Sequence, residues 1–174
     1  MLRIRDRLNR ILTDEQAAVL KAAIHGHNLF LSGQAGTGKS DLVKEIYRNV
    51  SAKGKNVSIV CSSATAGSVY DELNARVSTV HSHYGLGTAE LRANLVVNRS
   101  LSNNLVCERV KGEDVIIWDE ISMASRRLLD IANLLNCKLA PDAKSARCPF
   151  GGKQTILVGE LVQLPPASDF LDVG

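Results

Sequence analysis

The chain has 174 residues, of which 45% are hydrophobic and 22% are charged, and its formal net charge is +3. This length and composition suit one globular domain and exclude a disordered or collagen-like chain. The mildly basic charge permits a nucleic-acid partner without requiring one. Because no apolar run approaches the roughly 20 residues that span a bilayer, we expect no membrane partner.

The N-terminal segment 1–11 is rich in arginine. It resembles a mitochondrial presequence only weakly, because it is short and contains Asp6, so a solvated helix or a linker is the favoured interpretation. We therefore separate this basic segment from a domain predicted over residues 12–168, and we predict residues 169–174 to be a truncated C-terminal end.

The first predicted helix begins after Thr13 and ends near Gly26. Thr13 and Gln16 have the spacing of a capping box, in which two side chains satisfy backbone N–H groups reciprocally at the start of a helix. The short apolar run 28–32 predicts a strand, which leads into a glycine-rich turn and then an amphipathic helix over 40–50.

Further apolar runs predict three buried strands, over residues 57–61, 115–119 and 155–158. Between the first and second of these strands, the sequence predicts a loop at 64–70 that opens a helix to about Ala75, and a polar, glycine-punctuated stretch at 79–87. Two weak helices are predicted within 88–110. A helix at 124–136 and a loop at 138–152 are predicted before the last strand. Strands that alternate with helices predict an α/β fold, a parallel sheet with helices on both faces. Ligands of such sheets bind beyond the carboxyl ends of the strands.

The segment Gly33–Ser40 reads GQAGTGKS and fits the P-loop pattern G-x-x-x-x-G-K-[ST] at every fixed position. Glycines let the backbone wrap a phosphate chain with its N–H groups pointing inward, and the following helix directs its positive end at the same phosphates. Lys39 is expected to reach the β- and γ-phosphates, and Ser40 to ligate Mg²⁺. A chance glycine turn is the alternative, but the position between a strand and a helix favours nucleotide binding. The predicted nucleotide-binding residues of this loop are Gly33, Gly36, Thr37, Gly38, Lys39 and Ser40.

Asp119 and Glu120 lie at the end of a predicted strand. Because Mg²⁺ at Ser40 needs an oxyanion partner on a neighbouring strand, we predict that Asp119 completes the metal site. Glu120 is then placed to orient or deprotonate the attacking water. Acidic strand ends are also common on protein surfaces, but the presence of a P-loop favours the catalytic interpretation.

Gln163 follows the last predicted strand. Its amide is a candidate sensor of the γ-phosphate, and it joins Lys39 and Glu120 as a predicted catalytic residue. The alternative is a solvated surface glutamine.

These segments together resemble the petite integration frequency (Pif-one) DNA helicases of superfamily one over nearly the whole chain. The P-loop is similar to motif I of that family, and DEISM at 119–123 is similar to motif II. The other matching segments are LTDEQ at 12–16 (Q motif), 64–70 (motif Ia), 79–87 (the next DNA-side motif) and the run from FGGKQ at 150–154 to QLPP at 163–166 (motif III).

The resemblance implies a RecA-like domain that hydrolyses ATP with Mg²⁺ and moves five-prime to three-prime on single-stranded DNA, in DNA repair, recombination and telomere maintenance. It also implies that Gln16 contacts adenine. A second RecA-like domain, which this sequence does not contain, would supply an arginine that stabilises the transition state. We therefore expect this chain to bind Mg-ATP weakly, to hydrolyse it poorly and not to unwind DNA alone. The nucleus is the expected location, with the mitochondrion as the alternative.

Two positions depart from the family pattern. Glu160 stands where the family usually has Asp, and a displacement of about 1 Å near reacting groups can be costly. Ala66 stands where the family usually has Thr, with Thr65 beside it as a possible substitute.

Other residues have simpler interpretations. His81 and His83 form an H-x-H pair, which is too few ligands for a metal, and the resemblance places them in a loop near DNA. Trp118 is predicted to be a packed strand residue and not a stacking platform for bases. The cysteines contain no C-x-x-C pair, and we expect free thiols.

Two other functions stay open. The first is a non-catalytic ATP- or DNA-binding remnant, which the missing second domain and Glu160 favour and the intact P-loop, Asp119 and Glu120 disfavour. The second is an unrelated ring-forming P-loop ATPase, against which DEISM and QLPP argue.

Overall fold

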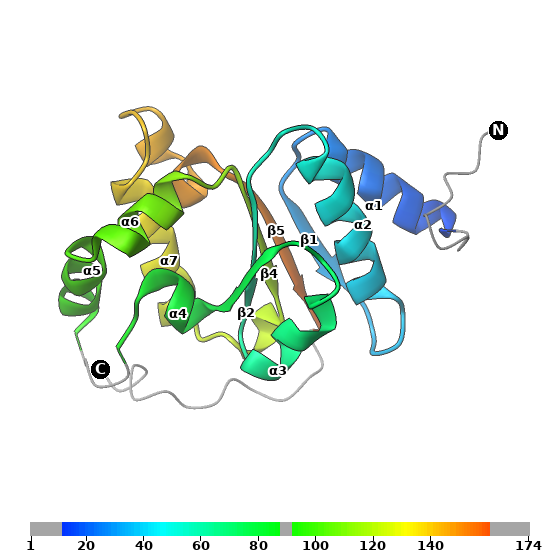
Figure 1. Cartoon of the computed structure of the whole chain (residues 1–174), viewed down its shortest axis with the longest axis horizontal. Helices are drawn as coiled ribbons and strands as arrows, with labels where there is room; N and C mark the ends of the chain where they lie inside the picture. Colours follow the sequence, from blue (N-terminus) through cyan, green and yellow to red (C-terminus); the bar gives the residue numbers. More distant parts are fainter. Residues whose placement is uncertain (1–11, 88–91, 161–174) are drawn as a thin grey trace.

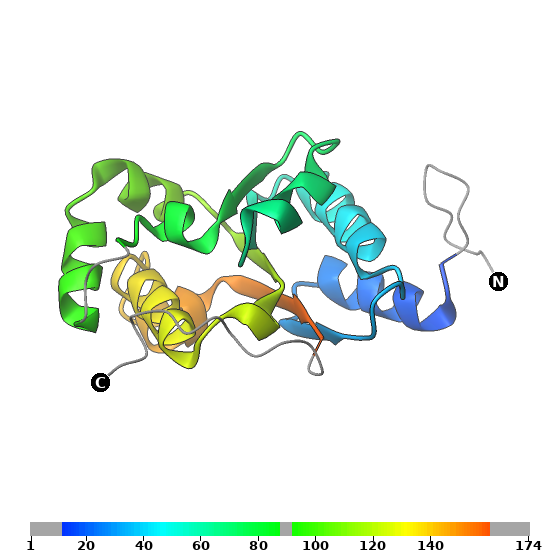
Figure 2. The same ribbon diagram turned by 90° about the horizontal axis from the view of Figure 1, so that it is seen from below.

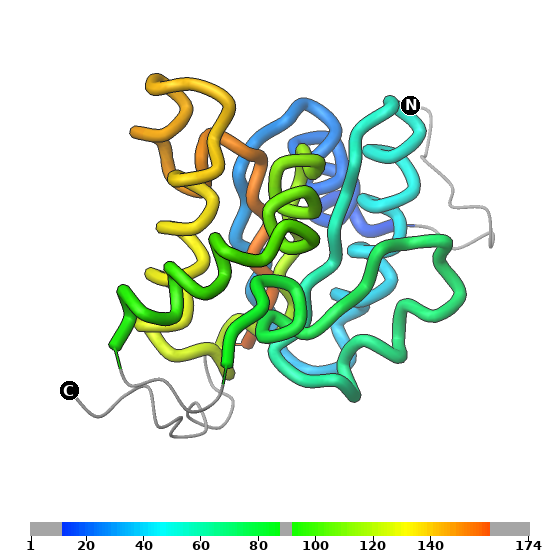
Figure 3. The backbone as a smooth tube through the Cα atoms, turned by 60° about the vertical axis from the view of Figure 1, so that its left-hand side comes forward, coloured from blue at the N-terminus to red at the C-terminus, as the bar shows by residue number. Residues whose placement is uncertain are grey.

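The structure is a computed structural model, and it describes residues 12–87 and 92–160 (Figure 1). Five strands form one sheet in which every neighbouring pair is parallel, in the order β1-β5-β4-β2-β3. The strands are β1 (Leu29–Ser32), β2 (Val57–Cys61), β3 (Arg76–Thr79), β4 (Val115–Asp119) and β5 (Gln154–Gly159). Figure 3 traces β5, coloured orange-red, among the other strands in the middle of the molecule.

Helices cover both faces of this sheet. One group contains α1 (Asp14–Ile24) and α2 (Lys39–Ser51), and the other contains α4 (Val80–Tyr84), α5 (Ala93–Leu101), α6 (Asn104–Lys111) and α7 (Arg126–Lys138). The view from below in Figure 2 shows the two groups on opposite sides of the strands. Short helices complete the described chain: α3 (Ala64–Gly67), η1 (Ser68–Tyr70), η2 (Ile121–Met123), η3 (Ser145–Arg147) and η4 (Pro149–Gly152). The predicted α/β fold with helices on both faces is confirmed.

Alternation along the buried strands divides the apolar residues into two clusters. Ile59 and Ile117 pack with α1 and α2, whereas Val60, Ile116 and Trp118 pack with α4 to α7. Because successive side chains of a strand point to opposite faces, each central strand contributes to both clusters. Trp118 is fully buried, so its prediction as a packed strand residue is confirmed.

Several local predictions hold in detail. The Thr13 hydroxyl accepts the Gln16 backbone N–H at 3.2 Å, and the Gln16 side chain accepts the Thr13 N–H at 3.1 Å, so the capping box is present. Strands β2 and β4 have the predicted bounds. The four cysteines of the chain are free thiols.

Three local predictions are wrong. The fifth strand, β3, was not anticipated, because it is a four-residue edge strand in which only Val77 is apolar. The segment 64–70, expected to be a loop, contains α3 and η1, and the helix expected to follow it to about Ala75 does not form. The polar stretch 79–87, whose histidines were expected to lie in a loop, contains α4, and the Thr79 hydroxyl caps this helix by accepting the Ser82 N–H at 3.2 Å.

The predicted domain limits at residues 11 and 168 fall outside the described chain. Within residues 12–87 and 92–160, no helix has both the length and the apolar character that a membrane crossing requires.

Candidate nucleotide-binding site

The P-loop connects the carboxyl end of β1 to the first turn of α2. Gly36 and Gly38 both have a φ of 79°, in the left-handed region that glycine adopts without strain. Gly38 is also the N-cap of α2, so the loop turns directly into the positive end of that helix. Local sequence therefore accounts for the loop: each sharp reversal falls on a glycine.

Lys39 holds the loop together from inside. Its ammonium donates to the carbonyl oxygens of Gly33 at 2.5 Å and Gln34 at 2.8 Å. These bonds keep a positive charge beside the loop backbone, which is where the phosphate chain of a nucleotide lies in P-loop proteins.

Gln16 brings α1 against the P-loop. Its amide nitrogen donates to the Thr37 carbonyl at 3.3 Å, while its amide oxygen completes the capping box. One side chain thus caps a helix and touches the loop 21 residues away in sequence. The predicted contact of Gln16 with adenine stays a prediction.

Asp119 and Glu120 follow β4 and come close to the P-loop. Strand β5 lies between β1 and β4, so the expectation that Asp119 would lie on the strand next to β1 is wrong. The carboxylate nevertheless shares a cavity with the P-loop, because parallel strands end at the same edge of the sheet.

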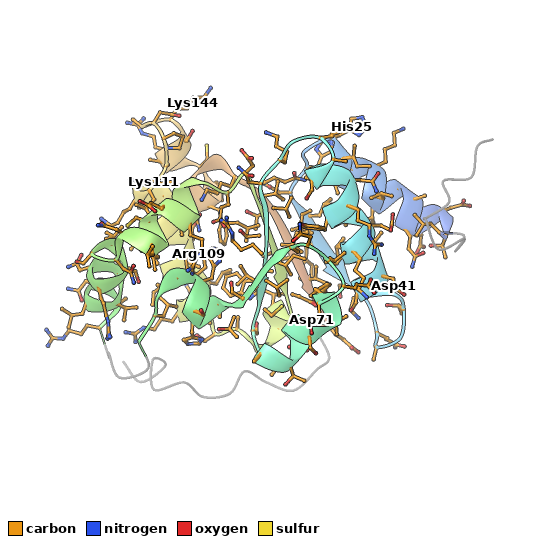
Figure 4. All side chains as sticks on the ribbon, viewed as in Figure 1. His25, Asp41, Asp71, Arg109, Lys111 and Lys144 are labelled. Atoms are coloured by element: carbon orange, nitrogen blue, oxygen red, sulfur yellow. The ribbon has the colours of Figure 1, made fainter. Side chains whose placement is uncertain are left out.

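The cavity at this edge has a volume of about 400 Å³. It is lined by the predicted residues Gly36, Gly38, Lys39, Ser40, Asp119 and Glu120, together with Ala35, Asp41, Gly159 and Glu160. Figure 4 labels Asp41, one of these lining residues, at the lower right of the view. The structure therefore brings the residues from three sequence segments into one site, and Gln163 lies outside the described residues.

The oxygen atoms of this cavity suit a magnesium ion. Ser40 offers a hydroxyl and Asp119 a carboxylate, and Mg²⁺ prefers oxygen ligands of this kind while keeping several waters. Ser40 and Asp119 are therefore the residues that would hold it.

The backbone of Glu120 is in the left-handed region, with a φ of 55° and a ψ of 40°. Such a conformation is uncommon for a residue with a side chain and persists where surrounding contacts enforce it. Here Ser62 donates to the Glu120 carbonyl at 2.8 Å, and Ser63 donates to its carboxylate at 3.0 Å. The end of β2 thus fixes the orientation of the predicted water-positioning carboxylate.

Sequence reasoning missed Ser62, Ser63 and Tyr70 as site residues. Tyr70 is fully buried, and its hydroxyl donates to Asp119 Oδ2 at 2.5 Å. Burial, and then the charge of Asp119, raise the pKa of Tyr70, so its hydroxyl stays protonated. Two sequence signals pointed to this stretch: residues 64–70 resemble motif Ia, and residues 62–70 follow a buried strand, as Gly33–Ser40 and Glu120 do.

Cys61, the last residue of β2, is buried beside the same carboxylates. Burial, followed by the charges of Asp119 and Glu120, raises the pKa of its thiol to about 12. The thiol is therefore protonated at neutral pH and acts as a small apolar residue.

The expectation that His81 and His83 lie in a loop is wrong, because both lie on α4. His83 is fully buried on α4, and its Nε2 lies 3.0 Å from a carboxylate oxygen of Glu113 in the core. Among residues 12–87 and 92–160, no group of three or more His, Cys, Asp and Glu side chains is arranged to hold a metal ion.

A larger cavity, of about 720 Å³, lies at the opposite edge of the sheet. Its lining includes Lys55, Lys111 and Asp114, and Figure 4 shows Lys111 toward the upper end, away from Asp41. This cavity contains neither P-loop residues nor Asp119. The smaller cavity is the candidate site, because it combines the P-loop backbone, a lysine, a hydroxyl and the carboxylates of Asp119 and Glu120.

The structure has a parallel sheet in which strand β1, the P-loop and helix α2 follow one another, and an acidic pair stands at the end of β4. These features define a RecA-like P-loop NTPase domain. The chain belongs to the PIF1-like helicase family, whose family model matches residues 11–170.

Individual relatives agree with this assignment. The ATP-dependent DNA helicase Pif1 of Bdellovibrio bacteriovorus is 34% identical over 157 residues, which are 90% of this chain and 33% of that protein. The crystal structure of Pif1 helicase from Candida albicans superposes with a TM-score of 0.80 at 33% identity, covering 91% of this chain and 34% of that one. Bacteroides Pif1 bound to single-stranded DNA has a TM-score of 0.68 at 26% identity, with 91% and 34% coverage. Its complex with ADP-AlF4 has a TM-score of 0.68 at 25% identity, with 91% and 34% coverage. The chain therefore spans about a third of the length of these relatives.

Proposed function

We propose that this chain is the first RecA-like motor domain of an ATP-dependent DNA helicase, which binds Mg-ATP at the P-loop and uses its hydrolysis to move five-prime to three-prime on single-stranded DNA. The observation that carries the proposal is the convergence of Lys39, Ser40, Asp119 and Glu120 on one cavity. The names of the relatives support an ATP-dependent helicase activity. The Bacteroides complexes with ADP-AlF4 and with single-stranded DNA support a nucleotide and single-stranded DNA as the ligands.

Each residue has a distinct part in this proposal. The P-loop N–H groups and the Lys39 ammonium bind the phosphates and offset their charge, and Gln16 contacts adenine. Mg²⁺, when bound, neutralises charge on the β- and γ-phosphates, and Ser40 and Asp119 hold it in place. Glu120, fixed by Ser62 and Ser63, orients the attacking water. Gln163 contacts the γ-phosphate.

The domain would work with a partner domain. Superfamily-one motors bind ATP between two RecA-like domains, and the relatives are about three times as long as this chain. We propose that the second domain supplies an arginine finger, which in general raises the hydrolysis rate by about 10³–10⁵-fold. On the basis of the family resemblance, we also propose roles in DNA repair, recombination and telomere maintenance. The proposed location is the nucleus, with the mitochondrion as the alternative.

The test measures nucleotide affinity and ATP turnover, with and without single-stranded DNA, in the unchanged chain and in Lys39→Ala and Glu120→Gln. We expect Lys39→Ala to weaken binding at least about tenfold, because a charge-assisted contact to phosphate is lost. We expect Glu120→Gln to keep binding and to lose turnover by about 10²–10⁴-fold.

Lys55→Ala is the matched control, because Lys55 lies at the opposite edge of the sheet and pairs with Asp114 at 3.9 Å. It should leave both quantities unchanged. Equal affinity in Lys39→Ala and the unchanged chain would contradict nucleotide binding at the P-loop. Binding without any turnover, even when a second domain is attached, would favour the non-catalytic remnant.

A further inference from the structure

A buried tyrosine hydroxyl lies at the metal-binding end of the candidate site. Tyr70 ends η1, and its side chain is fully buried in the cluster that also contains α1 and α2. Its hydroxyl donates to Asp119 Oδ2 at 2.5 Å, and the Glu120 backbone N–H donates to Asp119 Oδ1 at 2.9 Å. Both carboxylate oxygens are therefore held, which fixes the rotation of the side chain.

The same hydroxyl reaches the P-loop side of the site. The Ser40 side chain lies beside Tyr70, on the P-loop side of the cavity that Asp119 also lines. The tyrosine hydroxyl thus holds one of the two residues that would ligate Mg²⁺ and lies beside the other, although these residues come from β4 and α2.

Packing alone does not explain this arrangement. A phenylalanine would fill nearly the same volume without burying a polar group, and a buried hydroxyl costs free energy unless it is hydrogen-bonded. Partners of metal ligands are known in general to fix the orientation of those ligands and to set the affinity of the metal.

We propose that Tyr70 is a positioning residue for the magnesium site, which holds the Asp119 carboxylate in the orientation that the ion requires beside the Ser40 hydroxyl. This inference rests on the proposed function, because it assumes that nucleotide binds with Mg²⁺. Tyr70 touches neither nucleotide nor water in this role; it acts through Asp119.

The experiment compares nucleotide affinity in Mg²⁺ and in EDTA, using a fluorescent ATP analogue and the whole chain. The measured quantity is the dissociation constant in EDTA divided by the dissociation constant in Mg²⁺. This ratio is large when the metal contributes strongly to nucleotide binding. We expect Tyr70→Phe to reduce this ratio by about tenfold, within the range for partners of metal ligands in general, while affinity in EDTA stays unchanged.

Tyr84→Phe is the matched control. Tyr84 is also fully buried, and its hydroxyl accepts the Asn136 side-chain N–H at 2.9 Å, but it lies in the other cluster, with α4 to α7. Loss of this hydroxyl should lower the unfolding temperature without changing the ratio. A purely structural role of Tyr70 would give the same pattern as Tyr84.

The outcomes separate the two proposals. If the unchanged chain binds nucleotide with no dependence on Mg²⁺, or does not bind it, the proposed function fails and the positioning role fails with it. If binding depends on Mg²⁺ and the ratio is equal in Tyr70→Phe, only the positioning role is overturned.

A second measurement covers the case in which Tyr70→Phe does not fold. In the unchanged chain, the Tyr70 hydroxyl proton should exchange slowly enough to be observed by NMR, and it can be assigned from its proximity to the tyrosine ring protons. We expect its resonance to shift when ADP is added with Mg²⁺ and to stay in place when ADP is added with EDTA. Equal shifts in both conditions would overturn the inference.

Discussion

At the turn before β5, successive residues have left-handed backbone. Phe150 has a φ of 51°, Gly151 of 65° and Gly152 of 79°. A Cβ at Gly151 would lie 2.5 Å from the Asn136 carbonyl oxygen, so this position requires glycine for space as well as for conformation. The turn, which brings the chain from α7 into β5, therefore explains the sequence FGG at the start of the segment that resembles motif III.

This geometry makes a prediction at the residue scale. Gly151→Ala should lower the free energy of unfolding by about 1–3 kcal/mol more than Gly54→Ala, because overpacking is added to backbone strain. Gly54 has a φ of 79°, and a Cβ at this position would have no atoms within 4 Å. Gly54→Ala therefore introduces backbone strain without overpacking. Chemical denaturation of the two variants measures the difference, and equal losses would show that the turn can move away from Asn136.

At the element scale, a buried polar network ties together helices and strands that are distant in sequence. Glu113, which precedes β4, lies 3.0 Å from His83 on α4 and 3.2 Å from the Lys153 ammonium before β5. Lys153 also donates to the Asn136 side chain on α7 at 2.7 Å. A carboxylate buried in this way is tolerated because the Lys153 ammonium, of opposite charge, accompanies it.

The network makes stability depend on pH. Burial acts to raise the pKa of Glu113, but its interactions with His83 and Lys153 outweigh burial and hold the pKa below the ordinary value of 4.5. Since the folded pKa is depressed, the stability that the carboxylate contributes is present above pH 4.5 and is lost as the pH falls through the folded pKa.

Glu113→Gln should therefore lower the free energy of unfolding at neutral pH, by about 3–5 kcal/mol for a broken buried pair, and this loss should shrink as the pH falls below 4.5. Urea denaturation of both proteins at a series of pH values measures the difference. A loss that stays constant down to the lowest pH would contradict the depressed pKa.

At the scale of the whole molecule, the two apolar clusters share one sheet. Neighbouring residues of β4 enter opposite clusters, so neither cluster can lose its strands while the other keeps them. A domain of this kind is expected to unfold in one cooperative transition.

We expect Ile59→Ala in one cluster and Ile116→Ala in the other to lower stability by about 2–5 kcal/mol each. Both residues are fully buried. Each variant should still show coincident transitions by far-ultraviolet circular dichroism and by fluorescence of Trp118, the one tryptophan of the chain. Separate transitions for the two probes would mean that the faces of the sheet unfold independently.

The sequence by itself determined the fold class, the P-loop, the strand that ends at Asp119 and the capping box at Thr13. These features follow from local causes: glycine at left-handed positions, apolar runs of strand length and side chains that reach backbone groups three residues away. Only the tertiary structure decided that Tyr70 meets Asp119, that Ser63 meets Glu120, and that His83 is buried against Glu113. These pairs are 49, 57 and 30 residues apart in number, and the order in which parallel strands assemble, with β2 beside β4, brings them together. No local pattern encodes that order, because any of several strand arrangements would bury the same apolar residues.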